Sequence, residues 1–208
     1  MANGTISMDE VVQSTLKGII KSHKEYMKWS DGEWLWNAPE YFITVKIAEK
    51  IAKLEKSKFI TMEDNVHYIL GHANAKGSGK VHSDIRKDGR FDIVLWWAGG
   101  NPRAVIEVKN GVNSYNKIES DIARIKEVLK RKQVDSEIQF GLIAFYISQQ
   151  YKDSAESKLK KQIDHIFDEA KSSMGTDLKI QQYGQEYISC EDDKNAYCPV
   201  VFLIKRYT

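Results

Sequence analysis

Two carboxylates and one lysine near the middle of the chain have the types and the spacing needed to bind a divalent cation beside a positive charge. Asp92 lies in the segment 90–97, and Glu107 and Lys109 end the segment 103–109. Oxygen-only ligation by carboxylates suits a hard ion such as Mg²⁺ or Mn²⁺. An ammonium group next to such an ion can stabilise the charge that develops when a phosphoryl group reacts.

The segments that carry these residues have the pattern of a β-hairpin. Two apolar runs flank the turn signal Gly99-Gly100-Asn101-Pro102, which is typical of a tight connection between strands. A symmetric loop centred on Gly99 and Gly100 places Asp92 directly opposite Glu107. Because side chains alternate between the faces of a strand, one face carries Asp92, Val94, Trp96, Arg103, Val105, Glu107 and Lys109. The other face is wholly apolar and must pack on a core; it carries Ile93, Leu95, Trp97, Ala104, Ile106 and Val108.

The predicted pairing of Asp92 with Glu107 has an electrostatic cost. Directly opposed side chains have Cβ atoms about 5 Å apart, and like charges there destabilise a sheet. The pair therefore needs a bound cation or a raised pKa. The alternative is two surface carboxylates on a solvated face, with Lys109 as a salt-bridge partner. The metal-site interpretation is favoured because a nearly continuous apolar strand such as 104–108 seldom holds a central carboxylate without a partner.

At these residues the chain resembles the PD-(D/E)XK nuclease superfamily, which has the restriction-endonuclease-like fold. Asp92 matches the first acid, and Glu107-Val108-Lys109 matches the E-x-K element. The order of the surrounding elements is also similar: acid, hairpin turn, apolar strand, E-x-K, helix, and a further apolar strand at 140–147. The resemblance covers roughly residues 38–150. Phe91 stands where the name of the motif has Pro.

The resemblance implies an α/β fold with a restriction-endonuclease-like core, in which helices flank a central mixed β-sheet. It implies that Asp92, Glu107 and the Val108 carbonyl hold Mg²⁺, with Mn²⁺ as a substitute, and that Lys109 orients or helps to deprotonate the attacking water. The expected activity is that of an endonuclease that hydrolyses phosphodiester bonds, with DNA preferred as substrate, and leaves a 5′-phosphate. A role in restriction, defence or repair follows by analogy alone. Two alternatives stay open: a catalytically inactive module of the same fold that binds nucleic acid or a protein partner, and an unrelated α/β protein.

Glu40 is a candidate for completing the metal site, because in this fold a glutamate on the helix before the hairpin often does so. An equally good interpretation is a helix cap, since Asn37-Ala38-Pro39-Glu40 fits a capping box with Asn37 as the N-cap and Glu40 at N3. Glu63 is a weaker candidate for the same role. Asp121, on the predicted helix after the E-x-K strand, could support Lys109 or a metal-bound water from the second shell, or it is simply exposed.

Other polar residues give weaker signals. Trp96 and Arg103 face each other in the predicted register, either as a cation–π pair or as a surface on which a base could stack. Candidates for phosphate contacts are Arg86, Lys87, Arg90, Lys126, Lys130, Arg131 and Lys132. His67, His72 and His82 do not have the spacing of a zinc site. The segment 77–81 resembles a phosphate loop but has Val81 in place of the metal-binding Ser or Thr.

Hydrophobic periodicity and turn signals predict a single domain over residues 1–208, with a helical extension (1–36), a core (38–150) and a C-terminal helix with strands (151–208). The expected helices are 9–28, 38–56, 114–132 and 152–172. The expected strands are 58–62, the two strands of the hairpin, 138–147, 178–188 and 198–206, and residues 71–80 are expected to form a loop.

The composition is that of a globular protein, with 42% hydrophobic and 29% charged residues. A net charge of +2 neither demands nor excludes a nucleic-acid partner. No apolar run approaches the roughly 20 residues of a membrane span, and Cys190 and Cys198 form no zinc or disulfide pattern. A cytoplasmic protein with nucleic acid, preferably DNA, as its partner is expected, and a homodimer would let it reach both strands of a duplex.

Overall fold

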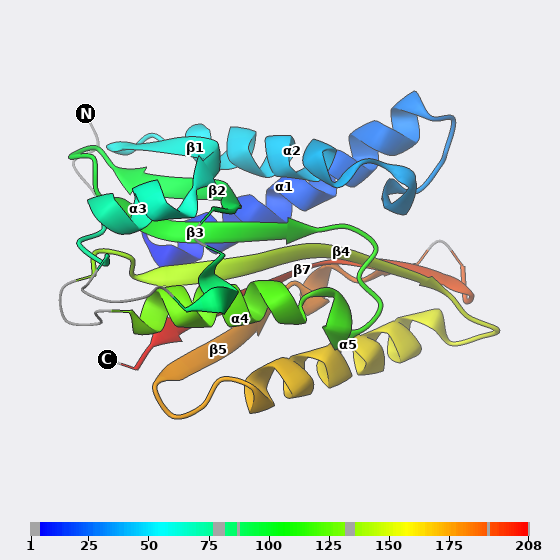
Figure 1. The fold of residues 1–208 in the computed structure, drawn as a ribbon. Coiled ribbons are helices and arrows are strands. Elements are labelled where there is room, and N and C mark those ends of the chain that lie inside the picture. Colours follow the sequence, from blue (N-terminus) through cyan, green and yellow to red (C-terminus); the bar gives the residue numbers. More distant parts are fainter. Residues whose placement is uncertain (1–4, 77–81, 87, 132–135, 191, 208) are drawn as a thin grey trace.

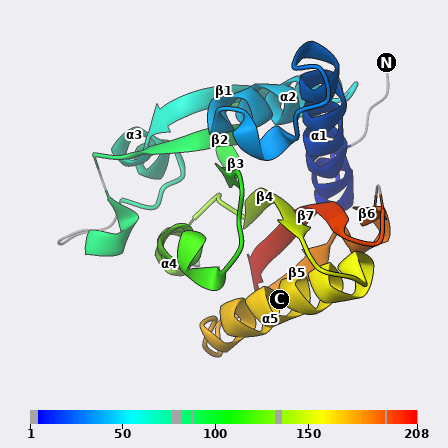
Figure 2. The same cartoon turned by 90° about the vertical axis from the view of Figure 1, so that its right-hand side faces the viewer.

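The computed structural model describes residues 5–76, 82–86, 88–131, 136–190 and 192–207. In these ranges a mixed sheet of seven strands lies between two layers of helices (Figures 1 and 2). The expected α/β class, with a central mixed sheet flanked by helices, is confirmed. Of the helices in the described ranges, none is long and apolar enough to cross a membrane.

The sheet has the strand order β1-β2-β3-β4-β7-β5, and the short β6 pairs with β7. Among the strand pairs of the described residues, β3 and β4 are parallel and the others are antiparallel. The strands are β1 Lys58–Asn65, β2 Arg90–Trp97, β3 Pro102–Lys109, β4 Phe140–Gln150, β5 Leu178–Tyr183, β6 Ser189–Cys190 and β7 Asn195–Arg206. Because β3 and β4 are parallel, their carboxyl ends meet at one end of the sheet, which Figure 2 views from the front.

The helices divide between the two faces of the sheet. Figures 1 and 2 show α1 and α2 over one face and α4 and α5 over the other. The α-helices are α1 Met8–Trp29, α2 Glu40–Ala52, α3 Val66–His72, α4 Glu119–Lys130 and α5 Ala155–Ser172. The four helices expected from periodicity are confirmed with shifted ends, and α3 was not among the expected helices; its last two residues lie in the segment expected to be a loop. The part of the chain that the structure describes also has four short 3₁₀ turns, η1 Leu35–Asn37, η2 Ser83–Ile85, η3 Tyr115–Lys117 and η4 Gln185–Tyr187.

The alternation of side chains along the hairpin produces two separate cores. Ile93, Leu95 and Ile106 pack with α1 and α2. Val94 and Val105 point the other way and pack with α4 and α5. The α1 helix, expected as an extension, is therefore one layer of the fold.

The predicted register of the hairpin is confirmed over its central part and fails near its turn. Ile93 pairs with Ile106 and Leu95 with Ala104, as a loop centred on Gly99 and Gly100 requires. A bulge between Leu95 and Trp96 then shifts the pairing, so that Trp96 lies opposite Pro102. A bulge adds one residue to one strand and changes the faces of the residues beyond it.

The close packing of α1 against α2 fixes the position of the second helix. A Cβ atom at Gly18 would lie 2.6 Å from the Cα atom of Ile47, so the contact requires glycine. Ion pairs flank this contact, with Lys21 to Glu49 at 2.8 Å and Lys46 to Glu25 at 2.5 Å. These contacts hold α2 against α1.

His23 on α1 is buried in a group of aromatic rings. Its ring lies 3.9 Å from that of Tyr197 and 6.1 Å from that of Trp34, measured between centroids. Its Nδ1 lies 3.2 Å from the hydroxyl of Tyr146. Burial, assisted by the charge of Lys24, lowers the pKa of His23 to about 4.

The buried, neutral His23 is expected to make the protein less stable in acid. The unfolded chain takes up a proton on this residue below pH 6.5, but the folded protein does so only near pH 4. The free energy of unfolding should therefore fall as the pH drops from 7 towards 4, with about 2 kcal/mol from His23 by pH 5. Urea unfolding at pH 8 and pH 5 measures the difference, and His23→Gln should remove that share. An equal loss in both proteins would assign the acid sensitivity to other groups.

Candidate active site

Asp92 lies where β2 and β3 stop pairing. In the described residues, the ladder between the strands includes Ile93 and Ile106 but no pair beyond them. Asp92 Oδ2 instead accepts a hydrogen bond of 2.7 Å from the backbone N–H of Val108. The carboxylate is thereby held against the backbone of the E-x-K segment, beside Glu107.

Glu107 is buried, with 3% of its surface exposed. Arg124 of α4 lies beside it, with Arg124 Nη2 and Glu107 Oε1 2.9 Å apart. The two form an ion pair by distance but not a hydrogen bond, since Glu107 Oε1 and Arg124 Nε have no hydrogen-bond partner among the described residues. Arg124 also donates to the carbonyl of Arg90, and its guanidinium lies 4.1 Å from the ring of Phe91.

Lys109 lies between two acids that come from different helices. Its Nζ is 3.3 Å from Glu40 Oε1 at the start of α2 and 3.3 Å from Asp121 Oδ2 in the first turn of α4. Asp121 is only 4% exposed. The expectation that Asp121 could support Lys109 therefore matches its position, and the view of it as a surface residue is wrong.

The capping-box prediction for Glu40 is wrong. The helix α2 begins at Glu40 itself, so that this residue is N1 and Pro39 is the N-cap, without a side-chain cap. Glu40 Oε2 accepts a hydrogen bond of 3.1 Å from the backbone N–H of Asn110, and Oε1 contacts Lys109. The side chain of Asn37 donates to Glu33 instead. Pro39 has φ −58° and ψ 138°, outside the helical region, so the helix begins only at Glu40.

Glu63 lies near Asp92 on the edge strand β1. Met62 pairs with Ile93 and Asp64 with Phe91, and Glu63 lies between them with a positive φ of 56°. Its charge raises the pKa of Asp92, as does that of Glu40. Glu63 is exposed to solvent, so it is the more accessible of the two candidate additional acids.

The ionisation of the three central residues follows from burial and from one another. Burial raises the pKa of Glu107 well above its usual range, and Arg124 only partly opposes this. Burial also raises the pKa of Asp92, although the hydrogen bond from the Val108 N–H and the charge of Lys109 act to lower it. For Lys109, burial would lower the pKa, but Asp121, Glu40 and Asp92 outweigh it and raise the pKa above its ordinary value. Lys109 is therefore held as a cation, while burial opposes the ionisation of Glu107 and Asp92.

The acids of this site outnumber its cations. The acids are Asp92, Glu107, Glu40, Asp121 and Glu63, and the cations are Lys109 and Arg124. Repulsion in such a cluster is relieved by protons or by a bound cation. A positively charged ligand is the addition that lets the acids ionise together.

The donor set fits Mg²⁺ with water as part of its coordination shell. In the described ranges no three His, Cys, Asp or Glu side chains converge closely enough to hold a metal by themselves. Mg²⁺ usually keeps several waters and uses one or two carboxylates, which Asp92 and Glu107 supply. The described residues contain seven buried side-chain nitrogen or oxygen atoms without a hydrogen-bond partner. Four of them gather here: Glu107 Oε1, Asp121 Oδ2, Asn110 Oδ1 and Arg124 Nε. Such atoms normally bind water or an ion.

The predicted surface of Trp96 and Arg103 is not formed. Trp96 is 3% exposed and donates to Thr61 at 2.7 Å. Arg103 lies on the opposite side of the sheet, 4.2 Å from the ring of Trp97, and donates to the carbonyl of Ile6. The bulge at Trp96 is the reason, because it moves Arg103 to the face covered by α1. Trp96 is too buried to stack a base.

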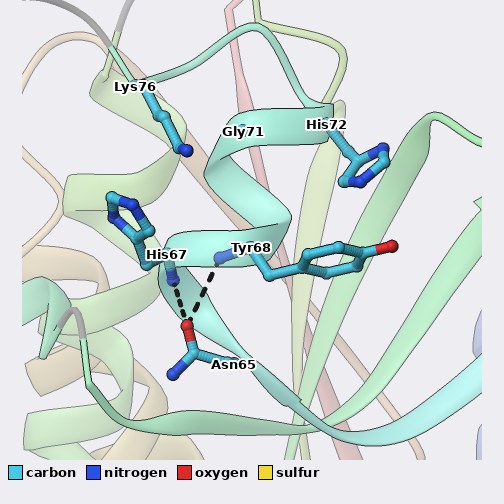
Figure 3. Close-up of a pocket in the computed structure, with 6 residues that line it drawn as sticks. All are labelled: Asn65, His67, Tyr68, Gly71, His72 and Lys76. Carbon is cyan, nitrogen blue, oxygen red and sulfur yellow. Dashed lines mark hydrogen bonds between the residues drawn. The ribbon is translucent and has the colours of Figure 1, made fainter.

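The histidines show no arrangement that would bind zinc. Figure 3 shows the rings of His67 and His72 on different sides of α3, with Tyr68 beside His72. His82 precedes η2, where its ring accepts a hydrogen bond from the backbone of Asp84. All three are exposed. The loop-like segment 77–81 lies outside the described residues.

The basic residues at the end of α4 are engaged in holding the fold. Lys126 donates to the carbonyl of Ser173, and Arg131 donates to the carbonyls of Ala75 and Lys76. Lys130 lies 3.9 Å from Glu127. Arg86 and Arg90 are exposed and could still contact phosphates. Lys87 and Lys132 lie outside the described residues.

Two residues of the site were not singled out from the sequence. Arg124 follows Asp121 by one helical turn, so both project from the same face of α4 among Ile122, Ile125 and other buried residues. Two charged residues on an apolar stripe are a detectable signal for a buried polar contact. Asn110 is the other, and its side-chain amide donates to the carbonyls of Leu35 and Ala38. Nothing in its sequence context indicated this bridge.

Comparison of the chain with protein-family models, curated proteins and solved structures finds no match. What the chain does is therefore inferred from the residues of the site.

Proposed function

We propose that this chain is a Mg²⁺-dependent endonuclease with a restriction-endonuclease-like core, and that it hydrolyses phosphodiester bonds in DNA. The observation that carries the proposal is the surplus of acids around Lys109, where β2 and β3 separate. The resemblance to PD-(D/E)XK nucleases supports it. The chain has the acid, hairpin, E-x-K strand, helix and parallel strand in that order.

Asp92, Glu107 and the Val108 carbonyl would hold the metal ion, with Glu40 and Glu63 close by. When bound, Mg²⁺ would neutralise charge on the phosphodiester and lower the pKa of a coordinated water. Arg124 keeps Glu107 in place through the ion pair and through its own contact with Phe91. A bound cation would also lower the pKa of both acids, which burial raises.

Lys109 acts as a fixed cation. Glu40 and Asp121 hold its ammonium from two sides and keep it protonated. In this state it donates hydrogen bonds to a non-bridging phosphate oxygen and orients the attacking water. The water oxygen bonds to phosphorus and gives up a proton to bulk water, the bond from phosphorus to the 3′ oxygen breaks, and that oxygen takes up a proton from bulk water. The products are a 5′-phosphate and a 3′-hydroxyl.

The proposal is tested by incubating the purified protein with supercoiled plasmid and with single-stranded DNA. Cleavage is expected with Mg²⁺ or Mn²⁺ and is expected to stop when EDTA removes the metal. Asp92→Asn should abolish it, while Asp168→Asn, an exposed acid on α5, should not. Cleavage that persists in EDTA, or that Asp92→Asn leaves intact, would contradict the proposed site.

One observation favours a second function, that of a catalytically inactive module that binds nucleic acid. Glu107 is already paired with Arg124, and burial raises its pKa, which opposes the ionised form that would bind a metal. Calorimetric titration with Mn²⁺ separates the two functions. A nuclease should bind the ion and lose affinity in Asp92→Asn, whereas an inactive module should show no binding in either protein.

A further inference from the structure

A cavity of about 420 Å³ opens beside the candidate active site. Trp34 and Trp36, from the segment before α2, line one side. Asn113, Gln149, Gln150 and Asn195, from the loop after β3 and from the ends of β4 and β7, line the other. Its volume lies in the range of small-ligand sites.

The lining of this cavity is aromatic and amide-rich, without a charged side chain among the described residues. The neighbouring site around Lys109 is highly charged. A planar, uncharged group with hydrogen-bonding edges matches the cavity, whereas a phosphate or a carboxylate does not. Nucleobases recognised outside a duplex are bound in this way, by stacking on aromatic rings and by hydrogen bonds to their edges.

The two tryptophans differ in how firmly they are held. The ring of Trp34 packs edge-on against Tyr197, with centroids 5.5 Å apart, and against His23. Trp36 is 61% exposed, and within the described chain no other ring contacts it. Trp34 is thus a fixed wall of the cavity, and the indole face of Trp36 is available for stacking.

Three of the four amide side chains supply hydrogen-bonding groups that the described fold does not use, whereas Asn195 donates to Asp192. The side chains of Asn113, Gln149 and Gln150 have no hydrogen bond to other described residues. Asn and Gln side chains can pair with a base edge through a donor and an acceptor at once. Because Gln149 and Gln150 end a β-strand, their backbone positions are fixed.

Asn110 connects this cavity to the candidate active site. Its side chain holds the carbonyls of Leu35 and Ala38 on either side of Trp36, and its backbone N–H is bound by Glu40. It lies between Lys109 and Gly111, which also lines the cavity. A base in the cavity would therefore belong to a nucleotide next to the phosphate that is cleaved.

We infer that this cavity binds an unpaired nucleobase beside the scissile phosphate, so that the preferred substrate is single-stranded DNA or DNA with an unpaired nucleotide. This inference rests on the proposed nuclease function. A duplex would bind only after one base leaves the stack, which costs energy and makes it the weaker substrate.

Fluorescence anisotropy with a labelled single-stranded oligonucleotide, and with the same strand in a duplex, tests the inference. Binding is measured in EDTA, so that it does not depend on cleavage. Trp36→Ala should weaken single-strand binding by about tenfold, with little effect on the duplex, and Trp36→Phe should restore most of it. Trp29→Ala is the matched control, because Trp29 is 66% exposed but lies outside the cavity, against Phe42.

The outcomes distinguish the cavity from the catalytic site. Equal affinity of Trp36→Ala and wild type for single strands would overturn the base site, even if the protein cleaves DNA. If Trp36→Ala loses single-strand binding but the wild-type protein never cleaves DNA, the base site would be supported and the nuclease function contradicted. Quenching of tryptophan fluorescence by neutral oligosaccharides but not by nucleosides would also overturn it.

Discussion

Replacing Lys109 with methionine is expected to lower the rate of DNA cleavage by about two to three orders of magnitude. The ammonium is a charge fixed in advance by Glu40 and Asp121, each 3.3 Å away. Removal of one such preorganised group from a reacting centre typically costs on the order of 10² to 10³ in rate. Methionine has a similar length and tolerates partial burial, so the fold should survive the change.

The measurement is single-turnover cleavage of a labelled oligonucleotide at saturating Mg²⁺. Lys160→Met, at an exposed position on α5, is the matched control and should cleave at the wild-type rate. Lys109→Arg should recover little, because the guanidinium is wider and cannot occupy the same place between two acids.

Metal binding separates a chemical role of Lys109 from a structural one. Removing a cation from among acids should leave the affinity for Mn²⁺ unchanged or raise it. Loss of cleavage with retained metal binding is therefore the expected combination. Loss of both would show that Lys109 maintains the site, and full activity in Lys109→Met would remove it from the mechanism.

The sequence predicted the part of the site that depends on local geometry. Alternation along a strand and the turn at Gly99 and Gly100 are local properties, and they placed Asp92 beside the Glu107 segment with separate cores behind the two faces. The bulge at Trp96 was not predictable, because it depends on how the end of the hairpin packs against the rest of the chain. That single shift moved Arg103 to the other face.

The partners of the site residues depend on long-range packing, which no local pattern records. Glu40 had a plausible local use as a cap, and only the packing of α2 against the sheet directs it to Lys109 and Asn110. The position of Arg124 on the apolar stripe of α4 signals a buried polar contact, but its partner Glu107 is set by how α4 packs against the sheet. The helices themselves were predictable because each has a continuous apolar stripe, whereas α3 is too short to show one.

Replacing Arg124 with methionine is expected to destabilise the protein by about 3 to 5 kcal/mol at pH 8, the usual cost of leaving one charge of a buried pair alone. Both side chains are almost fully buried, at 6% and 3% exposure. Urea unfolding measures the loss. Part of it belongs to the contacts of Arg124 with Arg90 and Phe91 and does not depend on pH.

The part of this loss of stability that is due to Glu107 can be recognised by the direction in which it changes with pH. Its folded-state pKa lies well above the unfolded value of 4.5, so the folded protein prefers the protonated acid. Stability from this residue is therefore present at low pH and is lost as the pH rises from 4.5 through the folded-state pKa. Without Arg124 that pKa rises further, so the loss of unfolding free energy in Arg124→Met should be smaller at pH 5 than at pH 8.

The double variant Glu107→Gln/Arg124→Met should recover most of the pH-dependent part of this loss and should cleave no DNA. A deficit independent of pH, or unchanged by Glu107→Gln, would mean that Arg124 stabilises the fold without compensating Glu107.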